Sequence, residues 1–384
     1  MIKLQKITTS LYPYNMILII GLQKNYDSRS LSLINTLKLK YEGKFSYINS
    51  NKNILFFRFF EILSKLILKI SLNFFSINSN IENIVVLYQS HLIYPFLFFL
   101  EKFYQRRIII DIGYPFEDNS AFNNKIKKLI YMKLEDFIFK NKKLIILLES
   151  SQQVKRISDK YLRNNIFAHY MTDSIGICSK KRTIKHNFIA KRYSEVNKFI
   201  DSKYFIFRGK FNPESGIIEI IKNYNIYSNK IKNPISLVIQ GHGGKYKEVE
   251  NILKELSNPN IFFIREFLKS YEIDYLLRNS HAIFGQFYNY KKRLNYTLPN
   301  KYFEALITKK LYITPDWEPL QKPYLEKLNN IIPKLTSPNK LGKWLIENHK
   351  NLCEIEKIQP KIESLSMTSY KFYESNNNLV FNKF

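Results

Sequence analysis

The sequence predicts an α/β protein made of two Rossmann-like, doubly wound domains. Short apolar runs alternate with segments of helical spacing, and this alternation occurs in two successive series along the chain. An apolar run of about four to eight residues is typical of a strand buried on both faces, as in a parallel sheet. The 384 residues amount to about two to three ordinary domains, and 45% of them are apolar, so each domain can bury a full core.

The first series indicates an N-terminal domain over residues 1–190. Its opening strand is the apolar run 17–20, which ends at Gly21, and the segment 30–40 that follows has apolar residues at helical spacing. Further strands are predicted at 84–90, 107–113 and 143–150. Strands that alternate with helices in this way form a parallel sheet with right-handed crossovers.

The second series indicates a C-terminal domain over residues 200–340, and the polar, basic stretch 179–203 is predicted as the linker. Its strands are predicted at 204–209, 235–241, 260–266, 281–287 and 310–315, with helices at 215–225, 246–256, 271–280 and 300–309. Residues 341–384 are predicted to form one or two helices that pack back toward the N-terminal domain, with residues 376–384 frayed.

The composition excludes several classes of protein. With 15% aromatic residues, the chain has too much core material to be disordered. Its two cysteines, Cys178 and Cys353, are far apart and adjoin no Cys/His cluster, which argues against a disulfide scaffold and a structural zinc site. No stretch reaches the roughly 18 uncharged apolar residues of a membrane span, and no secretory signal is readable, so a cytoplasmic location is expected.

Four sequence elements follow one another in the second domain. They are FRGKFNPESG at 207–216, LVIQGHGG at 237–244, a strand, helix and strand pattern at 258–287, and LPNKYFEALITKKLYIT at 298–314. In this order they resemble the nucleotide-sugar-binding domain of the GT-B glycosyltransferases, specifically the retaining glycosyltransferase family 4, and the P-x-K-x-x-E-A-L pattern is the most specific of the four. The resemblance implies two Rossmann-like domains that face a central cleft, and transfer of a sugar from a nucleoside diphosphate donor.

The resemblance implies that the first strand of this domain ends at the donor diphosphate. Gly209 lets the backbone turn and approach a ligand, and Lys210 occupies the place where the family usually has an arginine. The family's second cation is replaced here by Ser215, and Arg208 is a candidate for its role. Cations at this place would offset the negative charge that the leaving group gains.

The P-x-K-x-x-E-A-L element is predicted to begin a helix at Pro299 and Asn300. Lys301 and Glu304 are three residues apart, so both lie on one side of that helix. By the resemblance, Glu304 accepts hydrogen bonds from the ribose hydroxyls of the donor, and a carboxylate offers two acceptor oxygens to this diol. All four residues are therefore candidates for donor binding.

Other glycines and one arginine complete the candidate donor site. Gly241 and Gly243 are predicted to turn the chain at the carboxyl end of a strand, where open α/β sheets bind ligands. Arg265 lies beside the nucleobase by the resemblance, and Gly21 is a further donor-binding candidate at the end of the first apolar run. Tyr296 stands where many family members carry a second glutamate, so backbone groups and the loop around it are expected to hold the sugar.

The first domain is expected to carry the acceptor and any general acid or base. His91 follows the strand at 84–90, where the resemblance places a polar residue at the cleft, and Asp111 ends the next strand, whose carboxyl end faces the same cleft. A buried or loop-capping role is the alternative for each. They are candidate catalytic residues, together with Lys210 and Glu304. No D-x-D motif is found near the end of a strand, so a metal-independent reaction that needs no cofactor besides the donor is expected.

The net charge of +28 is concentrated in the first half, where residues 1–200 carry 32 Lys and Arg against 14 Asp and Glu. The stretches 56–75 and 92–107 are aromatic, basic and helical in pattern, which is typical of interfacial helices on anionic lipid; ordinary core helices with solvated lysines are the alternative. The expected partners are therefore a nucleotide sugar, a glycan or lipid-linked acceptor and an anionic membrane surface, with the protein peripheral on the inner face of the cytoplasmic membrane.

The expected function is glycosyl transfer with retention, in synthesis of a surface polysaccharide such as a capsule or lipopolysaccharide. One alternative is a nucleotide-sugar epimerase of GT-B fold, which needs additional acid/base residues that the sequence does not show. The other is a basic nucleic-acid-binding protein, because +28 suits a phosphate backbone. No recognised nucleic-acid-binding module is present, so nucleic acid is not expected as a partner.

Overall fold

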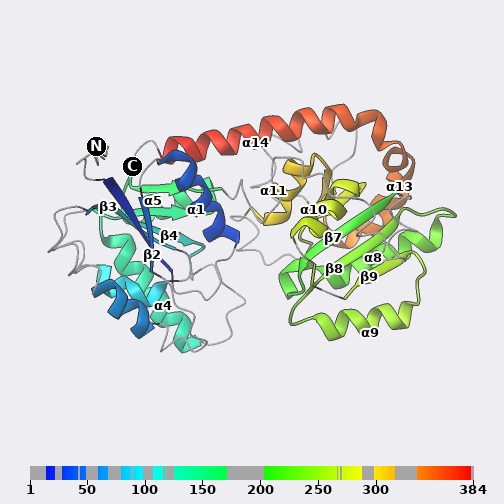
Figure 1. The fold of residues 1–384 in the computed structure, drawn as a ribbon. Helices are drawn as coiled ribbons and strands as arrows, with labels where there is room; N and C mark the ends of the chain where they lie inside the picture. The colour runs from blue at the N-terminus through cyan, green and yellow to red at the C-terminus, as the bar shows by residue number, and fades with distance from the viewer. Residues whose placement is uncertain are drawn as a thin grey trace, which may run out of the picture.

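A computed structural model of the 384-residue chain shows two α/β domains joined at one side by a long terminal helix (Figure 1). The structure describes residues 14–21, 28–41, 44–48, 59–67, 79–87, 90–97, 107–115, 117, 125–170, 203–265, 267–268, 270–287, 298–315 and 335–381. Two parallel sheets flanked by helices confirm the predicted α/β class.

The first domain is built on a six-stranded parallel sheet with the order β2-β1-β3-β4-β5-β6. Its strands are β1 (Tyr14–Ile20), β2 (Lys44–Ile48), β3 (Ser79–Val86), β4 (Arg107–Gly113), β5 (Ile145–Leu148) and β6 (Ile166–Ala168). The strands read as continuous apolar runs because both faces of the sheet are covered.

Helices cover both faces of this sheet, and successive side chains of a strand point to opposite layers. In β1, Leu18 and Ile20 belong to one core cluster, whereas Ile17 and Ile19 belong to the other. The first cluster packs under the helical segments 59–67 and 94–97, the 3-10 helix η1 (His91–Ile93), α4 (Lys125–Lys140) and α5 (Ser151–Tyr161). The second packs under α1 (Ser28–Lys40).

The second domain has a five-stranded parallel sheet with the order β11-β10-β7-β8-β9. Its strands are β7 (Tyr204–Lys210), β8 (Ser236–His242), β9 (Ile261–Ile264), β10 (Ala282–Phe284) and β11 (Leu311–Ile313). The helices between them are η3 (Pro213–Ser215), α8 (Ile217–Lys230), α9 (Tyr246–Leu256), α10 (Ser270–Asn279) and α11 (Asn300–Thr308).

The chain ends in helices that belong to the second domain and then leave it. They are η6 (Pro338–Lys340), α13 (Leu341–Cys353), η7 (Ile355–Ile358) and α14 (Gln359–Phe381). Along α14, Tyr373 is buried in the core of the second domain, whereas Val380 is buried in the core of the first (Figure 1). The expectation that residues 376–384 fray is wrong as far as Phe381, because buried contacts hold the last turns of α14.

The strand orders place a topological switch point in each sheet. In the first sheet the chain moves from β1 to β2 on one side and then to β3 on the other, and in the second sheet β8 and β10 flank β7. In open parallel sheets, the carboxyl ends of the strands at such a point form the usual ligand crevice. Within the described residues, no helix is both long enough and apolar enough to cross a bilayer.

Candidate functional site

The candidate site lies at the switch point of the second sheet, between the carboxyl ends of β7 and β10 and the first turns of α11. Gly209 near the end of β7 has a φ of +154°, in the region that favours glycine. A Cβ at this position would lie 2.7 Å from Cε of Lys301. The glycine therefore makes room for a lysine of α11 directly against the backbone of β7.

Lys301 is only 7% exposed and packs against the carboxyl ends of β7 and β10. Its Nζ lies 3.7 Å from the centroid of the Phe207 ring and donates a hydrogen bond to the carbonyl oxygen of Gly285 at 3.5 Å. Burial lowers the pKa of Lys301 from 10.5 to about 7; the charge of Glu304 opposes this effect and that of Arg208 adds to it. The site thus contains a lysine that titrates near neutral pH.

Glu304 lies one turn after Lys301 and is fully buried. Its Oε1 accepts a hydrogen bond from Nη1 of Arg208, the residue before Gly209 on β7. Its Oε2 is buried and accepts no hydrogen bond from the part of the chain that the structure describes. Because a buried carboxylate oxygen without a donor is costly, this atom is a ready acceptor for a ligand hydroxyl.

Glycines bring β7 and β8 close together beside this carboxylate. A Cβ on Gly241 would lie 1.9 Å from the carbonyl oxygen of Gly209, and one on Gly243 would lie 2.5 Å from the carbonyl oxygen of Phe211. Phe211 N donates to the His242 carbonyl at 2.9 Å, so the two strand ends remain joined beyond the regular sheet. No larger residue fits at these glycine positions without moving the backbone.

The turn after β7 is fixed by short-range polar contacts. The Asn212 side chain accepts a hydrogen bond from Ser215 N at 2.9 Å, which begins η3, and Ser215 is buried. Phe287 N donates to the Ser215 carbonyl at 3.2 Å, so the segment after β10 is attached to this turn. Ser215 therefore serves the turn through its backbone and through its hydroxyl, which donates to the Asn212 carbonyl at 2.7 Å.

The structure places the remaining predicted donor residues around this centre without testing their roles. Lys210 is exposed at the end of β7, and Pro299 and Asn300 are half-buried at the start of α11. Arg265 follows β9, is 62% exposed and lies 3.5 Å from a carboxylate oxygen of Glu250. Their parts in donor binding stay predictions.

The predicted residues of the first domain lie at the carboxyl ends of its strands. Gly21 follows β1, is buried, and its N–H donates to the Ile48 carbonyl at 3.1 Å. His91 begins η1 after β3, and its side chain lies outside the described part of the structure. Asp111 is fully buried on β4, where its carboxylate is engaged by Arg29 of α1. The catalytic roles of His91 and Asp111 stay predictions.

Arg29 and Asp111 form a buried ion pair that sequence reasoning missed. Arg29 Nε donates to both carboxylate oxygens, at 2.8 and 3.0 Å, and Nη2 lies 2.7 Å from Oδ1. Arg29 Nη1 also donates to the His169 carbonyl at 3.1 Å. The pairing joins positions 82 residues apart, and no local sequence signal announces it.

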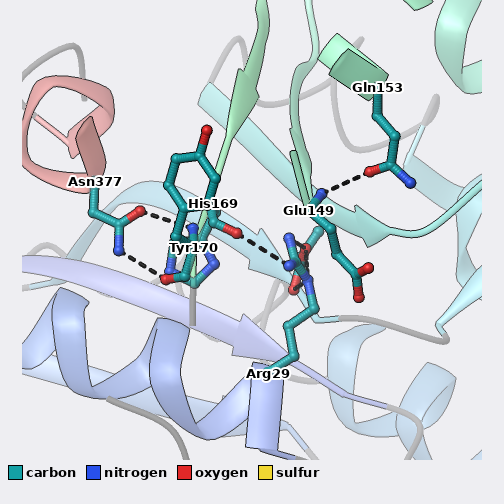
Figure 2. A network of polar contacts seen from close by, with 7 residues as sticks. Arg29, Glu149, Gln153, His169, Tyr170 and Asn377 are labelled. Carbon is teal, nitrogen blue, oxygen red and sulfur yellow. Dashed lines mark hydrogen bonds and ion pairs between the residues drawn. The ribbon is translucent and has the colours of Figure 1, made fainter. Parts of the chain in front are cut away.

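Tyr170, which follows His169 in the chain, connects this network to the terminal helix α14 (Figure 2). The Asn377 side chain of α14 accepts from Tyr170 N and donates to the Tyr170 carbonyl, both at 2.8 Å. His169 is fully buried, and burial together with the charge of Arg29 holds its pKa well below the ordinary range, so its ring is neutral at pH 7. Asn377 thus fastens α14 to the end of β6.

Aromatic rings gather at the ends of β8 and β9 and were also missed. The His242 ring lies 4.7 Å from that of Tyr246 and 5.3 Å from that of Phe267, which is 78% exposed.

Among the residues that the structure describes, no group of three or more His, Cys, Asp or Glu side chains is arranged to hold a metal ion.

No protein-family model and no curated protein sequence matches the chain. Among solved structures, its fold is that of the GT-B glycosyltransferases, a class of two Rossmann-like domains. Anabaena HepE in complex with UDP-glucose is similar, with a TM-score of 0.64 and 11% identity over 96% of this chain and 98% of that chain. Sucrose-phosphate synthase from Thermosynechococcus elongatus has a TM-score of 0.61 and 11% identity, with 94% of both chains covered.

A further similar structure is that of TarM from S. aureus, solved as a mutant in a complex that includes UDP. Its TM-score is 0.54 and its identity 15%, over 78% of this chain. The chain spans 55% of the length of the TarM chain.

Proposed function

We propose that this protein is a glycosyltransferase of the family 4 type, which moves a sugar from a nucleoside diphosphate sugar to a glycan or lipid-linked acceptor with retention of configuration. UDP is the first donor nucleotide to test, because the structures of TarM and HepE are complexes that include UDP and UDP-glucose, respectively. The observation that carries the proposal is the buried Glu304 carboxylate, whose second oxygen has no hydrogen-bond donor among the described residues.

Glu304 is assigned to the ribose of the donor. Arg208 occupies one carboxylate oxygen and fixes the rotation of the group, so the second oxygen is held in place for ribose hydroxyls. A hydrogen bond to an ionised carboxylate contributes about 1.5–3 kcal/mol, roughly twice a neutral one. This contact would therefore account for a large part of nucleotide affinity.

The diphosphate is assigned to the end of β7. Lys210 is exposed there, and within the described part of the chain it forms no ion pair. The N-terminus of α11 contributes N–H groups that are favourable for an anion. These groups would stabilise the negative charge on the departing diphosphate without a metal ion.

For the reaction itself, the bond between the anomeric carbon and the diphosphate oxygen breaks as the acceptor oxygen bonds to the same face of the sugar. The acceptor hydroxyl passes its proton to the departing phosphate oxygen, so no separate carboxylate base is required. His91 is proposed to face the reacting sugar from the first domain, since it follows β3 at the switch point of that sheet. A role in synthesis of a surface polysaccharide fits such an acceptor.

The test is a thermal-shift panel of UDP, GDP, ADP and CMP, followed by activity assays with the sugars of the nucleotide that binds. We expect a nucleoside diphosphate to raise the melting temperature, and Glu304→Gln or Lys210→Met to weaken its binding at least tenfold. Glu255→Gln on the exposed side of α9 is the matched control and should bind normally. Normal nucleotide binding by both site variants would contradict the assignment.

A further inference from the structure

The outward face of α4 in the first domain is unusually apolar. Ile126, Leu129 and Ile130 are 74%, 55% and 50% exposed, and Phe137 is 43% exposed. Single exposed apolar side chains are normal on a protein surface, but a contiguous group is not. Four on one helix therefore call for an explanation.

Helical geometry places these residues on one stripe. At 3.6 residues per turn, six positions of α4 fall within an arc of about 100°. These positions are Ile126, Leu129, Ile130, Lys133, Phe137 and Lys140. The opposite side of the helix carries Glu135, Ile138 and Phe139, which are buried against the sheet. The outward stripe, hereafter the α4 stripe, contains apolar residues and lysines, and Asp136 at its edge pairs with Lys140.

The packing of α4 shows that this face is not the buried face of an ordinary core helix. Ile138 and Phe139 already join the core cluster beneath the first sheet, on the side opposite α1 and the end of α14 (Figure 1). A surface helix of a globular protein normally turns polar residues outward. Here the apolar residues lie on both sides, so the outward set serves something other than this domain's own core.

We propose that the α4 stripe docks the protein on an anionic lipid bilayer, with Ile126, Leu129, Ile130 and Phe137 entering the interface between headgroups and acyl chains. A helix of this kind lies in the plane of the interface with its apolar side chains inserted and its lysines at the headgroups. Lys133 lies on the stripe itself, where it would meet lipid phosphates, whereas Lys140 at the end of the stripe pairs with Asp136 at 2.6 Å. The inference concerns a surface remote from the donor site and stands apart from the proposed glycosyl transfer.

Two further observations favour a bilayer as the occupant. The first half of the chain carries 32 Lys and Arg against 14 Asp and Glu, so the domain that bears the stripe has a charge complementary to anionic lipid. The segment 59–67, which packs on the same sheet face as α4, also turns apolar side chains outward, with Phe60 50% and Ile67 56% exposed. The broader stretch 56–75 was predicted as an interfacial helix, and the structure describes only this part of it.

The exposed apolar residues of the α4 stripe favour a bilayer over nucleic acid as its partner. Phosphate backbones are bound by cations and polar groups, and exposed isoleucines contribute nothing to that contact. Insertion of aliphatic side chains into a lipid interface, in contrast, removes them from water. A surface with both features fits lipid better than DNA or RNA.

The experiment is flotation of the full chain with vesicles of neutral phosphatidylcholine and with vesicles of phosphatidylcholine and phosphatidylserine in equal parts. We expect the wild-type protein to float with the anionic vesicles only. The variant Ile126→Ser/Leu129→Ser/Ile130→Ser should lose at least tenfold in partition, and Lys133→Glu should also reduce it. The matched control is Lys222→Glu/Ile226→Ser on the exposed face of α8, which should float as the wild type does.

Several results would overturn the proposal. They are equal flotation with both vesicle types, no flotation with either, or normal flotation of the triple variant. If neither the wild type nor the triple variant binds vesicles and both bind duplex DNA, the positive charge of the first domain serves nucleic acid instead. A wild-type dimer that the triple variant dissociates would assign the stripe to a second copy of the chain. A thermal shift with nucleotide, measured on each variant, checks that the variant is folded. If no nucleotide shifts the melting temperature of the wild type, that result counts only against the glycosyltransferase proposal.

Discussion

Replacement of the buried Lys301 by methionine is expected to stabilise the protein near neutral pH. Methionine has the length of the lysine stem, and it fills the space against the Phe207 ring and the Gly209 backbone without burying an ammonium group. The Arg208 and Glu304 ion pair remains in place, so the substitution leaves no isolated carboxylate in the site.

The magnitude follows from the pKa of Lys301. In the unfolded chain the lysine takes up its proton below about pH 10.5, whereas in the folded protein it does so only below about pH 7. The unfolded state therefore binds more protons between these values, and the free energy of unfolding decreases as the pH falls from 10.5 toward 7. Each pKa unit corresponds to about 1.4 kcal/mol. At pH values below 7 the shifted pKa of Lys301 therefore lowers the free energy of unfolding by about 5 kcal/mol, relative to its value above pH 10.5.

The measurement is urea unfolding of the wild type and Lys301→Met at several pH values between about 7 and about 10. The variant should gain several kcal/mol in the free energy of unfolding at the lower end, and the gain should shrink as the pH rises. Lys222→Met on the exposed face of α8 is the control and should change little at any pH. A variant that is less stable at pH 7, or a gain that does not depend on pH, would refute the reasoning.

Three further substitutions test other parts of the structure. Gly209→Ala should destabilise by about 1–3 kcal/mol, because its Cβ would lie 2.7 Å from a buried lysine, whereas Gly244→Ala meets nothing within 4 Å and should be neutral in the same urea titration. Asp111→Asn should cost about 3–5 kcal/mol, since it removes the carboxylate charge that pairs with the buried Arg29, and a calorimetric melting temperature close to that of the wild type would contradict this. Asn377→Ala should cost about 1–3 kcal/mol and expose the end of α14 to limited proteolysis, while Asn376→Ala, which loses only a bond within the helix, should be digested like the wild type.

Much of the fold could be predicted from the sequence because parallel strands buried on both faces have a simple pattern. The runs that begin at Ile17 and Tyr204 are continuous and apolar, and they form β1 and β7. The arrangement of the candidate site was partly predictable for a similar reason. Gly209, Lys301 and Glu304 lie in local motifs whose spacing fixes which side of a strand end or helix they occupy.

The contacts between distant segments could not be predicted. Arg208 is predicted as a second cation for the donor, and its pairing with Glu304, 96 residues away, became visible only in the structure. The engagement of Asp111 by Arg29 and the capture of the Tyr170 backbone by Asn377 depend in the same way on how separate elements pack. No local pattern encodes such pairings, because each partner alone looks like an ordinary polar residue.

The exposed apolar face of α4 was also not identified from the sequence. The interfacial stretches were predicted at 56–75 and 92–107, whereas the α4 stripe emerged only from the packed structure. The α4 sequence has apolar residues on both sides of the helix, so periodicity alone does not decide which side faces the sheet. Only the burial of Ile138 and Phe139 makes that choice visible.

The most direct test of the donor site compares UDP with its 2′-deoxy analogue by isothermal titration calorimetry on the wild type and on Glu304→Gln. If the free oxygen of Glu304 holds the ribose, the wild type binds UDP at least tenfold more tightly than 2′-deoxy-UDP, and the variant loses this preference. Equal affinity of the wild type for the two nucleotides, or a preference that survives in Glu304→Gln, would contradict the assignment of this carboxylate to the sugar of the nucleotide.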